Sequence, residues 1–366
     1  MKITGFNVYK VDLPLNEGGY KWSDGKLVTV FDTTLVEIHT DAGLTGIGEV
    51  CPLGSSYLPS YANGVRTGLA ELCKDLIGYD PTEISVINDV MDYKLKGHPY
   101  VKSPIDMACW DLLGKVSKLP VCKLLGGCFG DSVQLYRAIS KQAPLDMAKN
   151  VLEYKKQGYR KFQLKVGGCI DDDIARIREV RSVLDPGDFL VADANTGWMS
   201  HEAIKIVNQV KDLDVYIEQP CATYEECLRV RRHCNLPFIL DEVVHDIESL
   251  LHVQRDGSAD VVNLKISKFG GITKLKQARD LCVSMGIPMC IEDTWGSDVV
   301  TSAIISLAHS TPEKLRFSAT DFNSYCTIHV AEGAPQRIDG KTAATNKPGL
   351  GVELNTDVIG KPYLSI

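Results

Sequence analysis

The chain has 366 residues, of which 44% are hydrophobic and 24% are charged, and its formal net charge at pH 7 is −7. This length is sufficient for a barrel-sized domain and a second, smaller one. The negative charge and the lack of a basic run argue against nucleic-acid binding. No apolar run is long enough to span a membrane, and the alternating N-terminal segment MKITGFNVYKVDLPL predicts a strand and no signal peptide.

The N-terminal part predicts an α+β unit. Residues 1–50 alternate as in a β-meander, and TLVEIHTDAGLTGIGEV places an Asp-Ala-Gly turn between two strands. Helices are expected over 60–95 and 103–118. We expect the second helix to begin at Ser103 and Pro104, because serine caps a helix and proline tolerates the first helical position. Strands followed by helices indicate a unit separate from any barrel.

Eight short apolar runs then recur, each followed by a helical pattern. They end at Ser140, Lys165, Asp193, Glu218, Asp241, Lys265, Glu292 and Ser318, at intervals of 23 to 28 residues. Such repeated strand-plus-helix units predict an α/β fold of the (β/α)8 TIM-barrel type over residues 131–330. Residues 1–130 would form the α+β capping domain. The Gly- and Pro-rich tail, 331–366, is expected to return and complete it.

Three consecutive strands of this barrel end in carboxylates, namely Asp193, Glu218 and Asp241. Residues at the C-terminal ends of barrel strands converge on one site. Carboxylates that point together repel each other unless a cation neutralises them, and hard oxygen ligands suit Mg²⁺. The alternative is that each carboxylate caps a helix or forms a surface ion pair. Three of them in register favour a magnesium site.

Lysines end the second and sixth strands, which lie opposite each other in a ring of eight. Lys165 and Lys265 could therefore serve as two opposed bases, because burial and a nearby dication both lower a lysine pKa. Binding of a phosphate or carboxylate, or a Schiff base, is the alternative. Four further polar residues on the same strand ends are expected to support the site: Gln163, Asn195, Glu242 and Lys268.

Together these segments resemble the muconate-lactonizing subgroup of the enolase superfamily. The matching motifs are KSPIDMACWDLLGKVSKLPVCKLLGG, FQLKVG, VADAN, IEQP, LDE, LKISKFGG and EDTWG, which extend over the whole chain. The resemblance implies a capping domain on an enolase-like barrel, Mg²⁺ held by Asp193, Glu218 and Asp241, and catalysis by Lys165 and Lys265. The implied step is removal of a proton α to a carboxylate, with Mg²⁺ stabilising the enediolate. Family members often assemble as dimers or octamers, so we expect a homo-oligomer.

One position departs from the family pattern. Members usually carry Lys-x-Lys on the second strand, where this chain has Gln163-Leu164-Lys165. The first lysine of that pair lowers the pKa of the second by like-charge repulsion, and a neutral Gln163 removes this contribution. Unless the metal and burial compensate, Lys165 would titrate higher, and the enzyme would work best at alkaline pH.

Residues near the seventh strand and in the capping loops suggest a small cationic amino acid as substrate. Asp293 could pair with an ammonium and Trp295 could hold it by a cation–π contact, unless Trp295 is simply a packing aromatic. Tyr20, Trp22 and Tyr57 occupy the capping segments that close family active sites. The EDTWGSD segment and the Tyr57 loop resemble members that act on proline derivatives, the cis-3-hydroxy-L-proline dehydratases and hydroxyproline-betaine 2-epimerases.

The same sequence features are compatible with other functions. A dipeptide epimerase, an N-acylamino-acid racemase or a muconate cycloisomerase would share the same fold and metal site. A non-catalytic barrel that only binds a ligand is the alternative from a different class.

The twelve cysteines are spread along the chain with no Cys-x-x-Cys pair. Their tightest group, Cys221, Cys227 and Cys234, lacks the spacing of a zinc site, since only His233 lies nearby. Free cysteines in a large chain usually behave as small core hydrophobes. We therefore expect no disulfide framework and a reducing cytoplasm.

Overall fold

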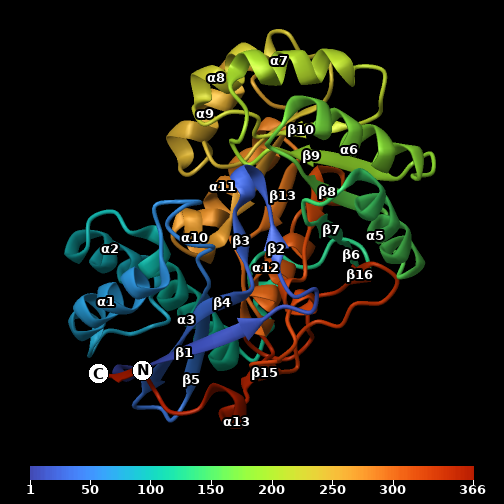
Figure 1. Cartoon of the computed structure of the whole chain (residues 1–366). Coiled ribbons are helices and arrows are strands. Elements are labelled where there is room, and N and C mark those ends of the chain that lie inside the picture. The colour runs from blue at the N-terminus through green and yellow to red at the C-terminus, as the bar shows by residue number, and fades with distance from the viewer.

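A computed structural model describes all residues, 1–366. The N-terminal meander consists of β1 (Ile3–Pro14), β4 (Val30–Thr40) and β5 (Thr45–Val50), which pair antiparallel in sequence order. The C-terminal strand β18 (Leu364–Ser365) adds to the free edge of β1, so the two ends of the chain lie side by side in one sheet (Figure 1). The last strand of the tail thus lies in the N-terminal sheet.

The helices of the N-terminal unit cover one face of this sheet. They are α1 (Ala62–Leu72), the 3-10 turn η2 (Cys73–Leu76), α2 (Ile84–Lys94) and α3 (Pro99–Ser117). The expected start of α3 at Ser103 is wrong, because Pro99 already occupies its first turn and Pro104 lies inside the helix. The earlier start buries Tyr100 and Val101 in the core of the unit. Gly48 of β5 permits the close approach of α3, since a Cβ there would lie 1.9 Å from the carbonyl oxygen of Pro104.

Eight parallel strands form the barrel in sequence order, and a bridge between Leu135 and Ala319 joins the last strand to the first. The strands are β7 (Tyr136–Ile139), β8 (Lys161–Lys165), β9 (Phe189–Asp193), β10 (Tyr216–Glu218), β11 (Phe238–Leu240), β12 (Val261–Lys265), β13 (Met289–Glu292) and β14 (Arg316–Ala319). The helices around them are α5 (Pro144–Lys156), α6 (Ile170–Ser182), α7 (Ser200–Gln209), α8 (Tyr224–Arg231), α9 (Ile247–Asp256), α10 (Ile266–Phe269), α11 (Ile272–Met285) and α12 (Asp298–His309). The fold is α/β with an enolase-like barrel, as expected.

The eighth strand differs from the expected repeat, because no long helix follows it. Only the 3-10 turn η4 (Phe322–Tyr325) comes after β14. The chain then forms short strands: β15 (Ala331–Glu332) pairs with β17 (Glu353–Leu354), and β16 (Lys341–Thr342) pairs with β6 (Val133–Gln134). The final helix α13 (Thr356–Ile359) leads to β18. The tail thus contacts the barrel before it reaches the cap. We propose residues 1–130 with 331–366 as one domain and 131–330 as the other.

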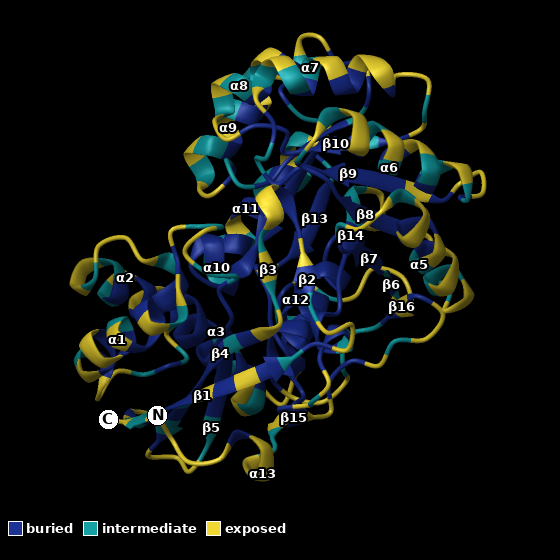
Figure 2. Cartoon of the chain, in the orientation of Figure 1, coloured by how far each residue is buried: buried dark blue, intermediate teal, exposed yellow.

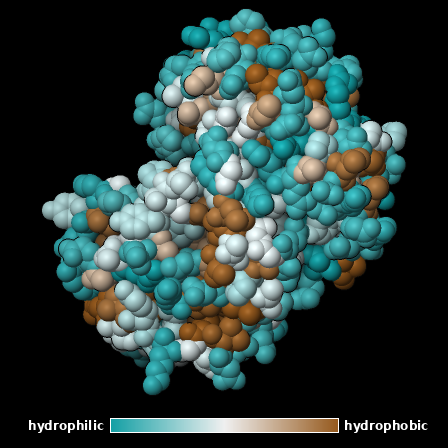
Figure 3. Space-filling model, viewed as in Figure 1, coloured by the Kyte–Doolittle hydropathy of each residue, from teal (hydrophilic) through white to brown (hydrophobic).

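The apolar core has two main parts, a large one in and around the barrel and a smaller one between the sheet and helices of the cap, and a third cluster of three residues lies on the barrel strands. Figure 2 shows buried strands surrounded by helices whose outer faces are exposed. On the face shown in Figure 3, hydrophilic residues predominate and hydrophobic ones form scattered patches. No helix is long and apolar enough to cross a membrane.

One buried lysine near the base of the barrel predicts a pH-dependent stability. Burial lowers the pKa of Lys161 to about 8 from 10.5, and its ammonium donates to the carbonyl oxygen of Phe317. Between these pH values the folded protein binds fewer protons than the unfolded one, so folding becomes more favourable as pH rises. Lys161→Met should be more stable than the native protein by up to about 3 kcal/mol at pH 7, and this difference should shrink towards pH 10. Urea unfolding from pH 7 to 10 measures it, and a constant difference would contradict it.

Candidate active site

The C-terminal ends of the barrel strands face the cap, and two segments of the cap close over them. One is the hairpin of β2 (Tyr20–Lys21) and β3 (Leu27–Val28), joined by the turn η1 (Ser23–Gly25) (Figure 1). The hydroxyl of Ser23 donates to the carbonyl oxygen of Asn195 at 3.1 Å, which fixes the hairpin to the loop after β9. The other segment carries Tyr57. Residues far apart in the sequence therefore enclose one site.

The three predicted carboxylates meet at this end of the barrel. Asp193 and Glu218 end the neighbouring strands β9 and β10 and lie directly opposite each other in the sheet, and Asp241 follows β11. All three are buried. Burial, followed by the charges of Asp193 and Asp241, raises the pKa of Glu218 well above its usual value. The structure thus brings three carboxylates together in the buried interior at the mouth of the barrel.

This donor set fits a hard divalent cation. The carboxylates are buried and come from three adjacent strands, and the charges of Asp193 and Asp241 raise the proton affinity of Glu218, a repulsion that a cation relieves. Carboxylate oxygens are the ligands that Mg²⁺ prefers. We propose Asp193, Glu218 and Asp241 as the magnesium ligands.

The two predicted lysines lie on opposite sides of these carboxylates, as their positions on β8 and β12 require. Lys165 donates to Asp193, and Nζ of Lys265 lies 2.5 Å from Oδ2 of Asp241 and 3.3 Å from Oε1 of Glu292. Burial lowers both lysine pKa values, but the surrounding carboxylates outweigh it, so both lie above the usual range. The sequence predicted that burial and a metal would lower both lysine pKa values. The protein residues around Lys165 and Lys265 by themselves raise them.

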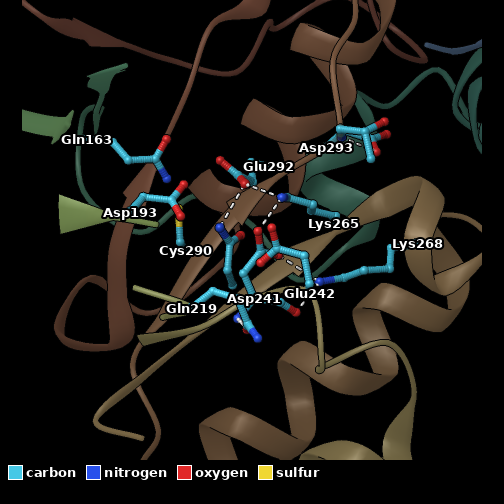
Figure 4. Close-up of polar contacts among 12 residues, drawn as sticks. Gln163, Asp193, Gln219, Asp241, Glu242, Lys265, Lys268, Cys290, Glu292 and Asp293 are labelled. Atoms are coloured by element: carbon cyan, nitrogen blue, oxygen red, sulfur yellow. Dashed lines mark hydrogen bonds and ion pairs between the residues drawn. The ribbon is translucent and has the colours of Figure 1, made fainter. Parts of the chain in front are cut away.

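Amide and ammonium groups hold the carboxylates in place (Figure 4). The amide nitrogen of Gln163 donates to one oxygen of Glu218 at 2.9 Å, and that of Asn263 donates to the other at 3.0 Å. Lys268 donates to Oδ1 of Asp241 at 2.8 Å, and its pKa is lowered by burial. Where family members usually carry a second lysine, Gln163 thus provides a neutral hydrogen bond, and this bond orients Glu218.

Asn195 and Glu242 form a hydrogen bond at the rim of the site. The amide nitrogen of Asn195 donates to Oε1 of Glu242 at 3.0 Å, whereas Oε2 of Glu242 has no protein partner. Burial raises the pKa of Glu242 to about 8. Glu242 and Lys268 also line a neighbouring cavity of about 280 Å³ between the cap and the barrel.

Below the lysines lies a polar group that was not predicted from the sequence. Asn263 also donates to Glu292 at 2.7 Å, and the hydroxyl of Tyr136 donates to the other oxygen of Glu292. These side chains connect β7, β12 and β13 across the barrel. Alternation along β12 could have identified Asn263, because it lies two residues before Lys265 and so shares its face.

The predicted substrate residues surround a narrow cavity of about 30 Å³ at the mouth. Its lining comprises Tyr20, Trp22, Leu53, Tyr57, Tyr136, Ala138, Gln163, Lys165, Asn195, Lys265, Glu292, Asp293, Thr294, Trp295 and Phe322. Asp293 accepts hydrogen bonds from Ser267 and Thr294 through Oδ1, while Oδ2 has no protein partner. Burial raises its pKa to about 6. The hydroxyl of Tyr57 lies 2.5 Å from Nζ of Lys265.

Trp295 is embedded among aromatic rings and is only 1% exposed. It stacks on Phe31 with a centroid distance of 4.1 Å and packs against Phe322 at 4.9 Å. These contacts support the packing interpretation over the cation–π contact. Tyr20 lies beside a reacting group, since its ring centroid is 6.0 Å from Nζ of Lys165. We propose Tyr20 as the aromatic wall of the cavity.

A buried carboxylate of the cap holds the segment that carries Asp293 and Trp295. Oε1 of Glu49 accepts a hydrogen bond from the backbone of Ser297, and Oε2 accepts one from Val300, each at 2.9 Å. Glu49 therefore caps α12 from another domain. Burial raises its pKa to about 7.

Glu49→Ala should loosen the cap from the barrel. Two buried backbone N–H groups would lose their acceptor, at a total cost of about 3 kcal/mol in unfolding free energy. We expect KM to rise about tenfold with a smaller change in kcat, because positioning rather than chemistry is lost. Urea unfolding and steady-state kinetics measure both effects. Glu49→Gln keeps one acceptor oxygen, so its unfolding free energy and its KM should lie between those of the native protein and those of Glu49→Ala. A fall in kcat with an unchanged KM would contradict the positioning role.

Comparison with known proteins identifies the family. The model described as "Mandelate racemase / muconate lactonizing enzyme, N-terminal domain" matches residues 27–126, and "Enolase C-terminal domain-like" matches residues 146–358. A cis-3-hydroxy-L-proline dehydratase of Roseibium aggregatum is 59% identical over 362 residues, which cover 99% of each chain. The chain belongs to the mandelate racemase/muconate lactonizing enzyme family. It is an enzyme of the enolase superfamily, whose similar members are a dehydratase and racemases or epimerases.

More distant members of the family agree with this assignment. An N-succinyl-L-Arg/Lys racemase of Bacillus cereus is 28% identical over 98% of this chain and 97% of its own. A family member from Roseovarius nubinhibens has a crystal structure with a TM-score of 0.97, 37% identity and coverage of 100% of this chain and 98% of its own. Another structure from that organism, with a TM-score of 0.97, 35% identity and full coverage of both chains, is complexed with magnesium.

Proposed function

We propose that this enzyme removes the α proton of cis-3-hydroxy-L-proline and eliminates its 3-hydroxyl group as water. The observation that carries the proposal is the placement of two buried lysines on opposite sides of a carboxylate trio. The 59% identity to a cis-3-hydroxy-L-proline dehydratase supports the substrate. The residues expected to contact the substrate, Tyr20, Tyr57 and Asp293, line the same cavity as both lysines.

Magnesium held by Asp193, Glu218 and Asp241 would supply a Lewis acid for the carboxylate of the substrate. The protein contributes the placement of the ligands. Gln163 and Asn263 hold both oxygens of Glu218, and Lys268 holds Asp241. A structure of a similar member complexed with magnesium supports this choice of metal.

The stereochemistry of the substrate suits two opposed lysines. In cis-3-hydroxy-L-proline the hydroxyl and the carboxylate share a ring face, so the α hydrogen lies on the face opposite the hydroxyl. We assign removal of that hydrogen to Lys165 as a neutral amine. Lys265 as an ammonium would protonate the departing hydroxyl from the other side. The C–H and C–O bonds break, a C2–C3 double bond forms, and water leaves.

The ring nitrogen of the substrate is expected to bind at Asp293. Its Oδ2 atom is buried and has no protein partner, whereas Oδ1 is fixed by Ser267 and Thr294. A cationic nitrogen placed there would pair with this oxygen. Tyr57 would close the cavity beside Lys265.

Epimerisation at the α carbon is the second candidate function. Substrates without a 3-hydroxyl group could be reprotonated by the opposed lysine, which would invert the centre. The similarity to N-succinyl-L-Arg/Lys racemase and to dipeptide epimerases favours this alternative. Proline betaines, dipeptides and acylamino acids are the substrates to examine.

Proton NMR in D₂O with Mg²⁺ tests the proposal. We expect loss of the 3-hydroxyl from cis-3-hydroxy-L-proline and much slower loss from the trans diastereomer, in which both events would fall on one face. Faster reaction of the trans compound would overturn the assignment of the lysines. Deuterium exchange in proline or hydroxyproline betaine alone would favour epimerisation. Exchange only in dipeptides or acylamino acids would move the substrate to those classes.

We further propose that the enzyme works as a homo-oligomer on a small carboxylate in the cytoplasm. Light scattering coupled to size exclusion measures the assembly directly. A monomeric mass at working concentration would refute the oligomer.

A further inference from the structure

Two cysteines lie next to each other outside the active site. Cys122 belongs to the short helix α4 (Val121–Leu124), and Cys128 lies in the loop between α4 and β6. Their sulfur atoms are 2.9 Å apart. This loop precedes the first barrel strands, so it lies at the end of the barrel opposite the catalytic strand ends. No residue of the proposed mechanism is involved.

The backbone between these cysteines holds them together. The N–H of Gly127 donates to the carbonyl oxygen of Cys122 at 3.0 Å, and that of Gly126 donates to Lys123 at 3.2 Å, as in a Schellman motif. Both glycines have positive φ angles, 126° at Gly126 and 99° at Gly127. The chain therefore reverses directly after α4 and brings Cys128 back to Cys122.

Contacts with the barrel fix the same loop from outside. The guanidinium of Arg279, on α11, donates to the carbonyl oxygen of Leu125 at 3.1 Å. The N–H of Phe129 donates to the carbonyl oxygen of His309 at 2.8 Å. The two thiols are thus positioned by the fold and do not depend on a chance approach of a mobile loop.

The two thiols differ in their access to solvent. Cys128 is exposed, whereas Cys122 is buried. Cys221 and Cys227 have the same spacing in the sequence but are both buried, so an external oxidant cannot reach them. Cys169 is exposed but has no neighbouring thiol among the contacts of the structure. Only the Cys122 and Cys128 pair combines proximity with an accessible sulfur.

We propose that Cys122 and Cys128 form a site of reversible oxidation to an intramolecular disulfide. The oxidant is a small disulfide of the glutathione class. The Cys128 thiolate attacks it, which forms a mixed disulfide and releases one glutathione thiol. The sulfur of Cys122 loses its proton and attacks Cys128, which releases the second. Two protein thiols are oxidised and one glutathione disulfide is reduced.

A metal site is the competing interpretation, because a ring nitrogen of His309 lies within 4.8 Å of both sulfurs. Both ring nitrogens of His309 are already engaged, one with the N–H of Ala344 at 3.2 Å and the other with the carbonyl oxygen of Gly130 at 3.0 Å. The positive charges of Arg316 and Lys123 also act on this histidine, each more strongly than the negative charge of Asp131. Engaged nitrogens and nearby cations disfavour a metal cation, so the disulfide is the better account.

Tryptic mapping of the oxidised protein tests this site directly. Cleavage after Lys123 separates Cys122, in LPVCK, from Cys128, in LLGGCFGDSVQLYR, so only a disulfide keeps the two peptides joined. After treatment with glutathione disulfide and alkylation of the remaining thiols, we expect the joined peptides, which a reductant should separate. The melting temperature should rise on oxidation, and kcat should not change.

Matched variants complete the test. Cys128→Ser should abolish the joined peptides and the rise in melting temperature, whereas Cys169→Ser, at the other exposed cysteine, should preserve both. If Cys122 and Cys128 are both still alkylated after the oxidation, in two separate peptides, the proposal is overturned. Zinc that binds the native protein, protects both thiols and is lost in Cys128→Ser would also overturn it, in favour of a metal site.

Discussion

Lys265→Ala is expected to separate proton exchange from loss of the hydroxyl group. Dehydration of cis-3-hydroxy-L-proline should fall by about 10³-fold, because the departing hydroxyl loses its acid. Exchange of the α hydrogen with D₂O should persist, because Lys165 remains in place. Lys165→Ala should lose both reactions. Proton NMR records exchange and elimination in the same sample.

Two controls support this comparison. Lys74→Ala removes an exposed lysine of the cap and should leave both reactions at the native rate. Circular dichroism and melting temperature establish that each active-site variant is folded. Loss of exchange in Lys265→Ala together with its retention in Lys165→Ala would reverse the two roles.

Glu218→Gln should make the metal-free protein more stable while it abolishes activity. The substitution keeps the shape of the side chain and removes a buried acid whose charged form is disfavoured by burial and by the charges of Asp193 and Asp241. The melting temperature without Mg²⁺ should therefore rise. Calorimetry should show Mg²⁺ affinity reduced by about 100-fold or more, and the reaction should become undetectable.

Glu225→Gln is the matched control, because Glu225 is an exposed residue of α8 close in sequence. It should change neither the melting temperature nor the affinity for Mg²⁺. A metal-free Glu218→Gln protein that is less stable than the native one would mean that the hydrogen bonds from Gln163 and Asn263 outweigh the relief of charge.

Much of the site could be predicted from the sequence, because barrel geometry converts strand ends into spatial neighbours. Asp193, Glu218 and Asp241 end successive strands, so a repeat of near-constant length is enough to bring them together. The opposed placement of Lys165 and Lys265 follows from the same count. None of these positions depends on the path of a loop.

Features that depend on packing could not be predicted in this way. The environment of Trp295 is built by Phe31 from the cap and Phe322 from the tail, which are distant in sequence. Local signals could not decide between Pro99 and Pro104 as the start of α3, because burial of the first turn made the choice. No long helix follows the eighth strand, because the tail after it forms short strands along the barrel instead.

The strand β18 has a consequence for how this protein is made. It completes the sheet that β1 begins, and the carbonyl oxygen of Ile366 accepts a hydrogen bond from Phe6 at 2.9 Å. The whole barrel is synthesised between these two segments. During translation the edge of β1 that pairs with β18 therefore stays unpaired until the barrel has emerged from the ribosome. Unpaired edges of this kind promote aggregation. Nascent chains stalled before residue 364 should accordingly depend on chaperones more than the finished protein does.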